Sequence, residues 1–352
     1  MTKFKVIGIM SGTSLDGVDL AGCEFFESNG KWNFHIQAAE TILYDDLWFS
    51  KLKNAHALSG FELTTLHVDY GRYLGKLAYN FMFSHHFTPG FIASHGHTVF
   101  HQPGSGLTLQ IGSGAEIAAQ SRITTISDFR TLDVALGGQG APLVPIGDRL
   151  LFDNYSFCLN IGGFSNISYE ENYRRMAFDI APSNIILNWL ANKTGKSFDE
   201  NGQIAATGNL IPNLFEQLNQ LEYYHKSPPK SLGREWVESE VLPLFEITEY
   251  QNADLLRTMV EHIAFQVAKA TKHSDAAQIL VTGGGAKNKF LIERISALTH
   301  HKVIIPDNLI IDYKEALVFA FLGVLRILHR PNCLGSVTGA ISDNCGGAVY
   351  SY

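Results

Sequence analysis

The chain has 352 residues, of which 45% are hydrophobic and 17% are charged, and its formal net charge is -7. This composition is typical of a globular protein with a large core and excludes a disordered chain. The length predicts about two domains. Because the charge is mildly negative, with a pI near 6.0, we expect no general attraction to nucleic acid or to an anionic membrane.

The cysteine pattern indicates a reducing compartment. Cys23, Cys158, Cys333 and Cys345 are scattered, with no C-x-x-C motif and no metal-ligand spacing. The apolar run at 6–10 is too short for a signal peptide, and no stretch reaches the roughly 18 apolar residues that a membrane helix needs. We therefore expect a cytoplasmic protein.

The first part of the chain predicts strands and helices. Residues 4–10 and 18–26 are rich in Val, Ile and Phe and predict two strands joined by the turn 11–17. Over 61–83, apolar residues recur at steps of three and four, which predicts a helix. Further strands are predicted in "GFIASHGHTVF", in "LTLQIGSGAEIAAQ" before a helix start, and in "ITTISDF".

The second part repeats this pattern. "SFCLNIGGFSNISYE" predicts a strand, a small-residue turn and a strand, and "RMAFDIAPSNIILNWLANK" predicts a strand ending at Asp179 and then a helix. An amphipathic helix is predicted over 254–272. "AQILVTGGGAKNKFLIERISAL" predicts a buried strand, a glycine turn and a helix from about Asn288, and "DYKEALVFAFLGVLRIL" predicts a closing helix. Strands alternating with helices indicate the α/β class.

The hairpin with a polar turn occurs near residue 12 and again near residue 163, which predicts two similar domains facing each other. The Gly- and Pro-rich "LGGQGAPLVP" favours a boundary. We expect domain I, with the first hairpin and the sugar-binding elements, over 1–138 plus 313–352. We expect domain II, with the second hairpin and an adenosine-binding turn, over 139–312. The closing helix is apolar on most faces, which favours burial between the domains and leaves a homodimer interface as the alternative.

The turn "SGTSLDG" has the chemistry of a phosphate site. Its glycines allow close approach of the backbone, and its N–H groups and the hydroxyls of Ser11, Thr13 and Ser14 can donate to phosphate oxygens. Asp16 and Asp19 would repel bare phosphate, but they suit Mg²⁺ held between them and the phosphates through water. The alternative is a solvated hairpin turn, in which the same residue types are common.

Two further glycine-rich turns support nucleotide binding. "NIGGFSN" at 160–166 would hold a polyphosphate from the second domain, opposite the first hairpin. "VTGGGAKN" at 281–288 follows a buried strand and opens a helix, so a purine and a ribose can lie against bare backbone. Alone, the second of these turns is more typical of a tight connection. The order of the three turns is what predicts a nucleotide site.

This order resembles the actin-like ATPase superfamily, and the wording of the motifs resembles the anhydro-N-acetylmuramic acid kinase family. The motifs are "GIMSGTSLDGVD", "SHGHTVFHQP", "LQIG", "DFRTLDVALGGQGAPLVP", "NIGGFSNIS", "FDIAPSNIILN", "VTGGGAKN", "EALVFAFLG" and "SVTGA", and they span nearly the whole chain. Two departures are His97, where the family often has Gln, and "DIAPSN" in place of the usual "DTGPGN" type. The resemblance implies two actin-like, ribonuclease H-like domains with a nucleotide cleft between them.

The resemblance also implies the reaction. A kinase of this family uses ATP and water to convert 1,6-anhydro-N-acetylmuramic acid, a small-molecule amino sugar, to N-acetylmuramic acid 6-phosphate and ADP, in peptidoglycan recycling. Mg²⁺ is expected to be bound through the nucleotide and water, near Asp16 and Asp19. The residues implied to bind ATP are Gly12, Thr13, Ser14, Leu15, Asp16, Gly17, Val18, Asp19, Gly162, Gly163, Gly283, Gly284 and Gly285.

Asp179 is the expected catalytic base. It matches the acidic position of the family motif, and a carboxylate at the end of a rigid strand can be aimed at a water molecule. Because the anhydro bridge joins C1 to O6, water must attack C1 while O6 leaves and takes the γ-phosphoryl group. The alternative is that Asp179 caps the helix opening at Pro182 or Ser183, since Asp is a favoured N-cap residue.

The residues expected to bind the sugar are His97, Thr98, His101, Asp128, Arg130, Asn184 and Glu315. Arg130 presents a planar fork that suits the lactyl carboxylate, and its alternative is an ion pair with Asp128 or Asp133. Glu315 matches a family glutamate, and its alternative is favourable placement in a first helical turn.

Several competing functions are weaker. His95, His97 and His101 invite a zinc site, but no fourth ligand follows nearby. Hydrogen bonding to sugar hydroxyls, or a role as a core histidine, is favoured over zinc binding. "TGKS" at 194–197 imitates a Walker A ending without its first glycine, and "IGSGAEI" imitates a dinucleotide-binding turn without its third. The main alternative function is an actin-like ATP switch or assembly protein, which would not need a sugar acceptor.

Overall fold

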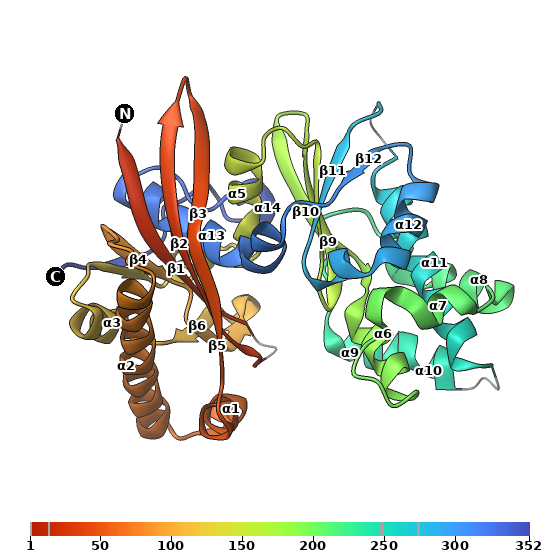
Figure 1. Ribbon diagram of the computed structural model, residues 1–352, viewed down its shortest axis with the longest axis horizontal. Coiled ribbons are helices and arrows are strands. Elements are labelled where there is room, and N and C mark those ends of the chain that lie inside the picture. The colour runs from red at the N-terminus through yellow and green to blue at the C-terminus, as the bar shows by residue number, and fades with distance from the viewer. Residues whose placement is uncertain (1, 13–14, 247–249, 273–274) are drawn as a thin grey trace. The chain divides into compact units, whose positions relative to one another are not determined.

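The computed structural model describes residues 2–12, 15–246, 250–272 and 275–352, and it divides into two compact units (Figure 1). Unit 1 comprises residues 1–151 and 313–352, and unit 2 comprises 152–312. The expected boundary after residue 138 is wrong, since residues 139–151 belong to unit 1. Helix α5 (Val144–Leu151) packs against the sheet of that unit, and its buried Asp148 pairs with the buried Lys314 at 2.6 Å.

Unit 1 is built on a sheet of six strands in the order β13-β7-β4-β1-β2-β3. Strands β1, β4 and β7 are parallel, whereas β2 is antiparallel to both of its neighbours. A separate antiparallel pair, β5 and β6, follows β4. The strands are β1 (Lys3–Ser11), β2 (Gly17–Ser28), β3 (Lys31–Leu43), β4 (Phe91–Ser94), β5 (His97–Gln102), β6 (Leu107–Ile111), β7 (Thr125–Ser127) and β13 (Ala348–Tyr350).

Helices cover both faces of this sheet. Ile7 and Ile9 of β1 pack in one apolar cluster with residues of helix α2, whereas Gly8, which faces the other way, lies against the backbone of α13. The predicted helix at 61–83 is confirmed as α2, which begins with a capping box between Ser59 and Glu62. The α-helices of unit 1 are α1 (Asp46–Lys53), α2 (Gly60–Ser84), α3 (Gly114–Ser121), α4 (Thr131–Ala135), α5 and α14 (Gly335–Thr338), with most of α13 (Asn308–Ile327).

Unit 2 repeats the same strand order. Its sheet runs β10-β9-β8-β11-β12, with β9 antiparallel to its neighbours and with β8, β11 and β12 parallel. In both units the first strand of the motif is therefore central and its hairpin partner lies next to it. The strands are β8 (Phe157–Ile161), β9 (Phe164–Glu171), β10 (Arg174–Pro182), β11 (Gln278–Thr282) and β12 (Lys302–Ile304).

The core of unit 2 is organised around helix α11 (Asn252–Ala270), which packs against α6, α7, α12 and β10 and is buried along most of its length. This helix confirms the amphipathic helix predicted over 254–272. The other α-helices are α6 (Asn184–Asn192), α7 (Gln203–Thr207), α8 (Pro212–Gln220), α9 (Arg234–Trp236), α10 (Leu242–Glu246) and α12 (Lys289–Leu298). No helix in the described ranges has the length and apolar character that crossing a bilayer requires.

A neutral histidine is buried in this core. The His262 ring is bonded to Asn219 Oδ1 at 3.0 Å and to the Tyr224 hydroxyl at 2.8 Å. The amide oxygen of Asn219 can only accept and the phenol can donate, so the ring is a neutral tautomer with the proton on Nδ1. Burial lowers the pKa of His262 to about 3.

Acid is therefore expected to destabilise the protein through His262. The unfolded chain takes up a proton near pH 6.5 while the folded chain does not, so stability falls as the pH drops below 6.5, by about 1.4 kcal/mol per pH unit. Urea unfolding measures the free energy of unfolding at pH 7 and at pH 5. We expect the difference between these two values to be about 2 kcal/mol smaller in His262→Gln than in the wild type. The exposed His56 provides the control, because His56→Gln should keep the wild-type difference. An unchanged difference in His262→Gln would contradict the assignment.

Candidate active site

The predicted site residues of unit 1 gather where its parallel strands end. Ser11 ends β1, His95 follows β4, and Arg130 follows β7. Ligands of open α/β sheets bind at the carboxyl ends of such strands. The sheet topology therefore brings together three polar groups that lie far apart in the sequence.

Arg130 is held by two acceptors. Its Nε donates to His95 Nε2 at 2.9 Å, and its Nη1 donates to the Gly140 carbonyl at 2.6 Å. His95 Nδ1 lies 2.8 Å from the Gly96 carbonyl, so this ring is neutral, and burial together with the charge of Arg130 keeps the His95 pKa well below its ordinary value. Nη2 of Arg130 has no hydrogen-bond partner in the described part of the chain, so one edge of the guanidinium is left for a ligand.

The alternative role for Arg130, an ion pair with Asp128 or Asp133, is wrong. Asp133 is fully buried and accepts from the Gly140 N–H at 2.8 Å, Thr338 Oγ1 at 2.9 Å and Asn344 Nδ2 at 2.8 Å. It thereby fixes the Gly140 turn whose carbonyl holds Arg130. Asp128 is exposed and accepts from the Thr131 hydroxyl at the start of α4.

Glu315 and Asp19 add negative charge to this part of unit 1. Burial lowers the pKa of Arg130 to about 10, and the Glu315 carboxylate acts in the opposite direction. Asp19 lies within electrostatic range of Glu315 and accepts from the Thr41 hydroxyl at 2.6 Å. Glu315 itself makes no hydrogen bond or ion pair within the described ranges. Asp19 is a hard-oxygen group of the kind that Mg²⁺ prefers.

The first hairpin is fixed by a ring of hydroxyls. Ser11 Oγ lies 2.7 Å from Tyr44 Oη and 2.8 Å from Tyr70 Oη, and the two tyrosine hydroxyls are 2.6 Å apart. In such a ring each hydroxyl donates once and accepts once. The Ser11 proton is therefore used inside unit 1, and the predicted donation from Ser11 to a phosphate is wrong.

The other residues of this hairpin that were predicted to bind ATP differ in their exposure to solvent. Thr13 and Ser14 lie outside the described residues. Asp16 is exposed, Gly12, Leu15 and Gly17 are half-buried, and Leu15 has a φ of 61°. Val18 is fully buried in the core. The Val18 side chain is therefore not accessible to ATP, and the predicted contact would have to come from its backbone.

The histidine-rich segment is less exposed to a ligand than predicted. His97 is buried next to Ser11 and Gly12, and burial lowers its pKa to about 4. Its neutral ring supports the first hairpin. Thr98 and His101 lie on β5, where they contact Gln110 and Thr108 of β6. Among the described residues, no group of three or more His, Cys, Asp or Glu side chains forms a metal site.

In unit 2, Asp179 lies within β10 and does not end it. The strand continues to Pro182 with a register shift between Asp179 and Ala181. The N-cap of α6 is Ser183, so the alternative role of Asp179 as a helix cap is wrong. Its Oδ2 accepts from the Leu232 N–H at 2.8 Å. Oδ1 has no hydrogen-bond partner in the described ranges, and burial raises the pKa of this carboxyl.

The backbone around Asp179 is also fixed by the 223–232 segment. The Asp179 N–H donates to the Lys230 carbonyl at 3.1 Å, and the Tyr223 hydroxyl donates to the Asp179 carbonyl at 2.5 Å. Together with Leu232, this segment holds the residue by its backbone and by one carboxylate oxygen. The free oxygen has the geometry of a positioned base.

The two glycine turns of unit 2 lie at the carboxyl ends of neighbouring strands, because β8 and β11 are paired and parallel. A Cβ at Gly283, whose φ is 81°, would lie 2.6 Å from Asn160 Oδ1, and one at Gly285 would collide with Ile161. These two glycines are therefore required by tight packing. Gly163 and Gly284 are exposed, with open space at Gly163 and no contact under 3.7 Å at Gly284, so a flat ligand can approach the backbone there.

The first N–H groups of helix α6 are hydrogen-bonded to the turn between β8 and β9. The Gly163 carbonyl accepts from the N–H groups of Ser183 and Ile185, and the Gly162 carbonyl accepts from Asn184. These helix N–H groups are therefore unavailable to a phosphate. The Asn184 amide points toward the Ile161 carbonyl, 3.4 Å away, and lies beside Gly284. Asn184 is thus placed at the glycine turn of unit 2.

Sequence reasoning missed several residues that hold the site in place. His95 was considered as a zinc ligand, as a sugar contact and as a core histidine, but its hydrogen bond with Arg130 was not predicted. The Gly140 carbonyl, the Leu232 N–H and the Tyr223 hydroxyl carried no sequence signal, because their contacts span 10, 53 and 44 positions.

Two units with one strand order, each with polar groups or glycine turns at the carboxyl edge of its sheet, are the architecture expected of the ribonuclease H-like, actin-like fold. A model of the anhydro-N-acetylmuramic acid kinase family matches residues 4–352. The chain belongs to this family and is an enzyme.

Two relatives that bear the name of this family agree with the assignment. The chain is 35% identical to an anhydro-N-acetylmuramic acid kinase of Actinobacillus pleuropneumoniae over 370 residues, covering 99% of this chain and 100% of that protein. It is 34% identical to one of Synechococcus elongatus, covering 99% of each. Among solved structures, component A of the Acidaminococcus fermentans (R)-2-hydroxyglutaryl-CoA dehydratase has a TM-score of 0.47 and 13% identity, covering 90% of this chain and 96% of that one.

Proposed function

We propose that the protein is an ATP-dependent kinase that opens 1,6-anhydro-N-acetylmuramic acid with water and phosphorylates O6, giving N-acetylmuramic acid 6-phosphate and ADP in peptidoglycan recycling. The observation that carries this proposal is the family match over residues 4–352. The arrangement of Arg130 and Asp179 supports it, since one residue offers a free guanidinium edge and the other a free carboxylate oxygen.

The sugar is assigned to unit 1. Its lactyl carboxylate accepts from the free edge of Arg130, which His95 and Gly140 keep in place. Glu315, which makes no hydrogen bond within the described residues, accepts from sugar hydroxyls. Thr98, His101 and Asp128 are exposed or half-buried and stay candidate contacts, whereas the buried His97 acts by supporting the hairpin.

The nucleotide is assigned to the glycine turns and the first hairpin. Gly163 and Gly284 offer open backbone, and Gly12 and Asp16 lie on the hairpin after β1. Mg²⁺ is the expected metal because Asp16 and Asp19 are hard oxygen donors. When bound, the metal would neutralise charge on the phosphates during transfer.

Asp179 acts as the general base. Its free Oδ1 takes a proton from water as the water oxygen attacks C1 of the sugar. The C1–O6 bond breaks, O6 takes the γ-phosphoryl group, and ADP leaves. The proton on Asp179 then passes to solvent. The Leu232 N–H orients the carboxylate while it gains and loses this proton.

The competing function, an ATP switch without an acceptor, is not favoured because the family match spans the chain. The two are separated by incubating the protein with ATP, Mg²⁺ and the anhydro sugar in ¹⁸O-water. We expect sugar-dependent ADP formation and one ¹⁸O atom in the product by mass spectrometry. Unlabelled product kept in the same water corrects for exchange at C1. ADP formation that ignores the sugar would instead support the switch.

Asp179→Asn is expected to lower kcat by about 10²–10⁴, because the amide cannot take the proton from water. The Asn side chain still offers an oxygen to Leu232, so the fold and nucleotide binding by calorimetry should be unchanged. In the wild type, activity should be lost as the pH falls through the raised pKa of Asp179. Asp307→Asn, at an exposed helix start, is the control. Near wild-type turnover in Asp179→Asn would reject the assignment.

Arg130→Lys is expected to raise the sugar KM by about 10–100-fold and to leave the ATP KM nearly unchanged, because an ammonium cannot form a two-pronged bond to a carboxylate. His95→Leu should give the same split by removing the acceptor for Nε, and His95→Gln should recover part of the loss. Steady-state kinetics with each substrate varied measures the split. Equal effects on both KM values would exclude the sugar contact.

A further inference from the structure

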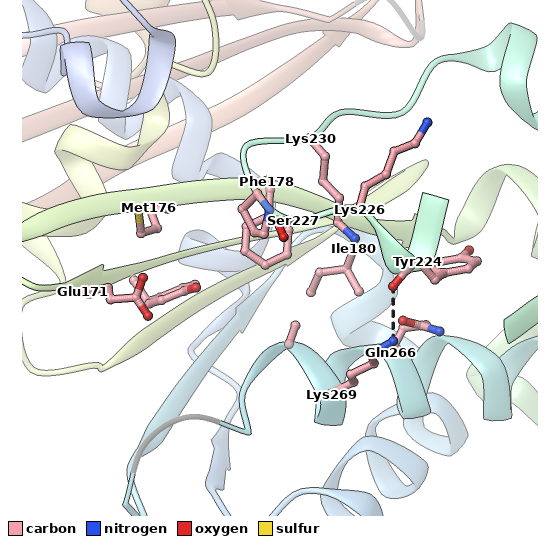
Figure 2. Close-up of a pocket in the computed structure, with 13 residues that line it drawn as sticks. Glu171, Met176, Phe178, Ile180, Tyr224, Lys226, Ser227, Lys230, Gln266 and Lys269 are labelled. Atoms are coloured by element: carbon pink, nitrogen blue, oxygen red, sulfur yellow. Dashed lines mark hydrogen bonds between the residues drawn. The ribbon is translucent and has the colours of Figure 1, made fainter. Parts of the chain in front are cut away.

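Unit 2 contains a pocket that the proposed reaction does not use. It has a volume of about 410 Å³ and is formed by β9, β10, the C-terminal part of α11 and the segment 224–230 (Figure 2). A cavity of this size accommodates a small molecule.

The pocket runs along β10 from Met176, at the end of the sheet far from the glycine turns, to Ile180, which lies beside the Asp179–Asn166 pair. Tyr169, one of its lining residues, pairs with Phe157 at the start of β8, whereas Gly162 follows the end of that strand. Along β10, Phe178 and Ile180 line the pocket. Met176 and Phe178 line the pocket from alternate positions of β10, before the register shift that follows Asp179, so the Asp179 side chain projects to the other face of the sheet. The carboxylate of Asp179 therefore does not line the pocket.

Two lysines bring uncompensated positive charge to this pocket. Lys230 Nζ donates to the Tyr223 carbonyl at 3.1 Å, and Lys269 Nζ donates to the Tyr224 carbonyl at 3.2 Å. Within the described ranges neither ammonium has a carboxylate partner. Lys226, in contrast, pairs with Glu222 at 3.1 Å, and Figure 2 shows its side chain directed away from the cavity.

The positive charges of Lys230 and Lys269 repel each other. Burial lowers the pKa of Lys230, and the charge of Lys269 lowers it further. Glu171 is the only carboxylate in the lining, it is exposed, and Figure 2 shows it at the other end of the pocket from Lys230. An anion near Lys230 and Lys269 would remove this repulsion.

The rest of the pocket is apolar with a few polar groups. Phe178, Ile180 and Met176 from β10 supply a hydrophobic wall. The hydroxyls of Tyr169 and Ser227 have no hydrogen-bond partner among the described residues, so they are available to a ligand. Apolar walls with a few placed polar groups are typical of a small-molecule site.

We propose that this pocket binds a small organic acid, with its apolar or aromatic body against Phe178 and Ile180 and its anionic group at Lys230 and Lys269. An occupant also acts on Asp179 through the 223–232 segment. Lys230 offers its carbonyl to the Asp179 N–H, and Tyr223, whose carbonyl holds the Lys230 ammonium, donates its hydroxyl to Asp179. This second part rests on the proposed role of Asp179 as the base.

Binding is tested on the full chain with 8-anilinonaphthalene-1-sulfonate, whose fluorescence rises in an apolar site, and with its neutral analogue N-phenyl-1-naphthylamine. We expect saturable binding of the sulfonate and at least about tenfold weaker binding of the neutral compound, because a charge-assisted hydrogen bond contributes about 1.5–3 kcal/mol. Equal affinities in the wild type would overturn the site. This comparison needs no variant.

Matched lysine variants locate the site. Lys269→Met keeps the apolar stem and removes the charge, so it should weaken sulfonate binding about tenfold or more. Lys226→Met, which removes the lysine paired with Glu222, should bind as the wild type does. An unchanged affinity in Lys269→Met, with a wild-type circular dichroism spectrum, would overturn the site.

The effect on Asp179 is tested separately by turnover. Saturating sulfonate should change kcat in sugar-dependent ATP turnover, and Lys269→Met should abolish that change. Binding without a change in kcat would overturn the coupling and leave the site in place. A protein that binds the sulfonate at Lys269 but shows no sugar-dependent turnover at all would count against the proposed function and not against the pocket.

Discussion

The hydrogen bond from the Leu232 N–H to Asp179 Oδ2, at 2.8 Å, is the contact on which the proposed chemistry depends. Without this donor, the carboxylate could rotate about its side-chain bonds and would take up a proton more readily. One backbone donor fixes its orientation and partly offsets the rise in pKa that burial causes. Because Leu232 lies 53 positions from Asp179 in the sequence, the aim of the base depends on the fold of unit 2 as a whole.

Arg130 in unit 1 is likewise a charged group that polar partners hold in place, but its charge is positive. A guanidinium in protein surroundings needs acceptors, and here they are a neutral histidine and a backbone carbonyl, with no carboxylate at hydrogen-bond distance. A carboxylate partner would have satisfied the positive charge and left less of it for a ligand. Asp133 contributes indirectly, since it binds the Gly140 N–H and so fixes the turn that presents the carbonyl.

The sequence predicted the architecture well where periodicity and turn chemistry are local. The central hairpins and helices α2, α11 and α13 follow from apolar spacing and glycine turns, and the motif order led to the right family.

The boundary after 138 was wrong because a Gly- and Pro-rich stretch looks the same within a domain as between domains, and the buried pair of Asp148 with Lys314 joins positions far apart. The hydroxyl partners of Ser11 and the burial of the Val18 side chain were not foreseen for a related reason, since both are tertiary properties. Strand β3 was missed although it is the longest strand of unit 1, because its polar face weakens the apolar pattern.

The two units use one strand order for different chemistry. In unit 1 the carboxyl ends of the parallel strands lead into charged and imidazole side chains, which recognise groups by hydrogen bonds of fixed direction. In unit 2 the corresponding ends lead into glycines, where tight packing at Gly283 and Gly285 excludes side chains and leaves Gly163 and Gly284 open. A surface of bare backbone can hold a flat ligand without distinguishing its substituents. The guanidinium of Arg130, in contrast, is fixed in position and selects a carboxylate. The repeated fold therefore supplies the position of each group, and the few residues after each strand decide whether that position presents a held polar side chain or open backbone.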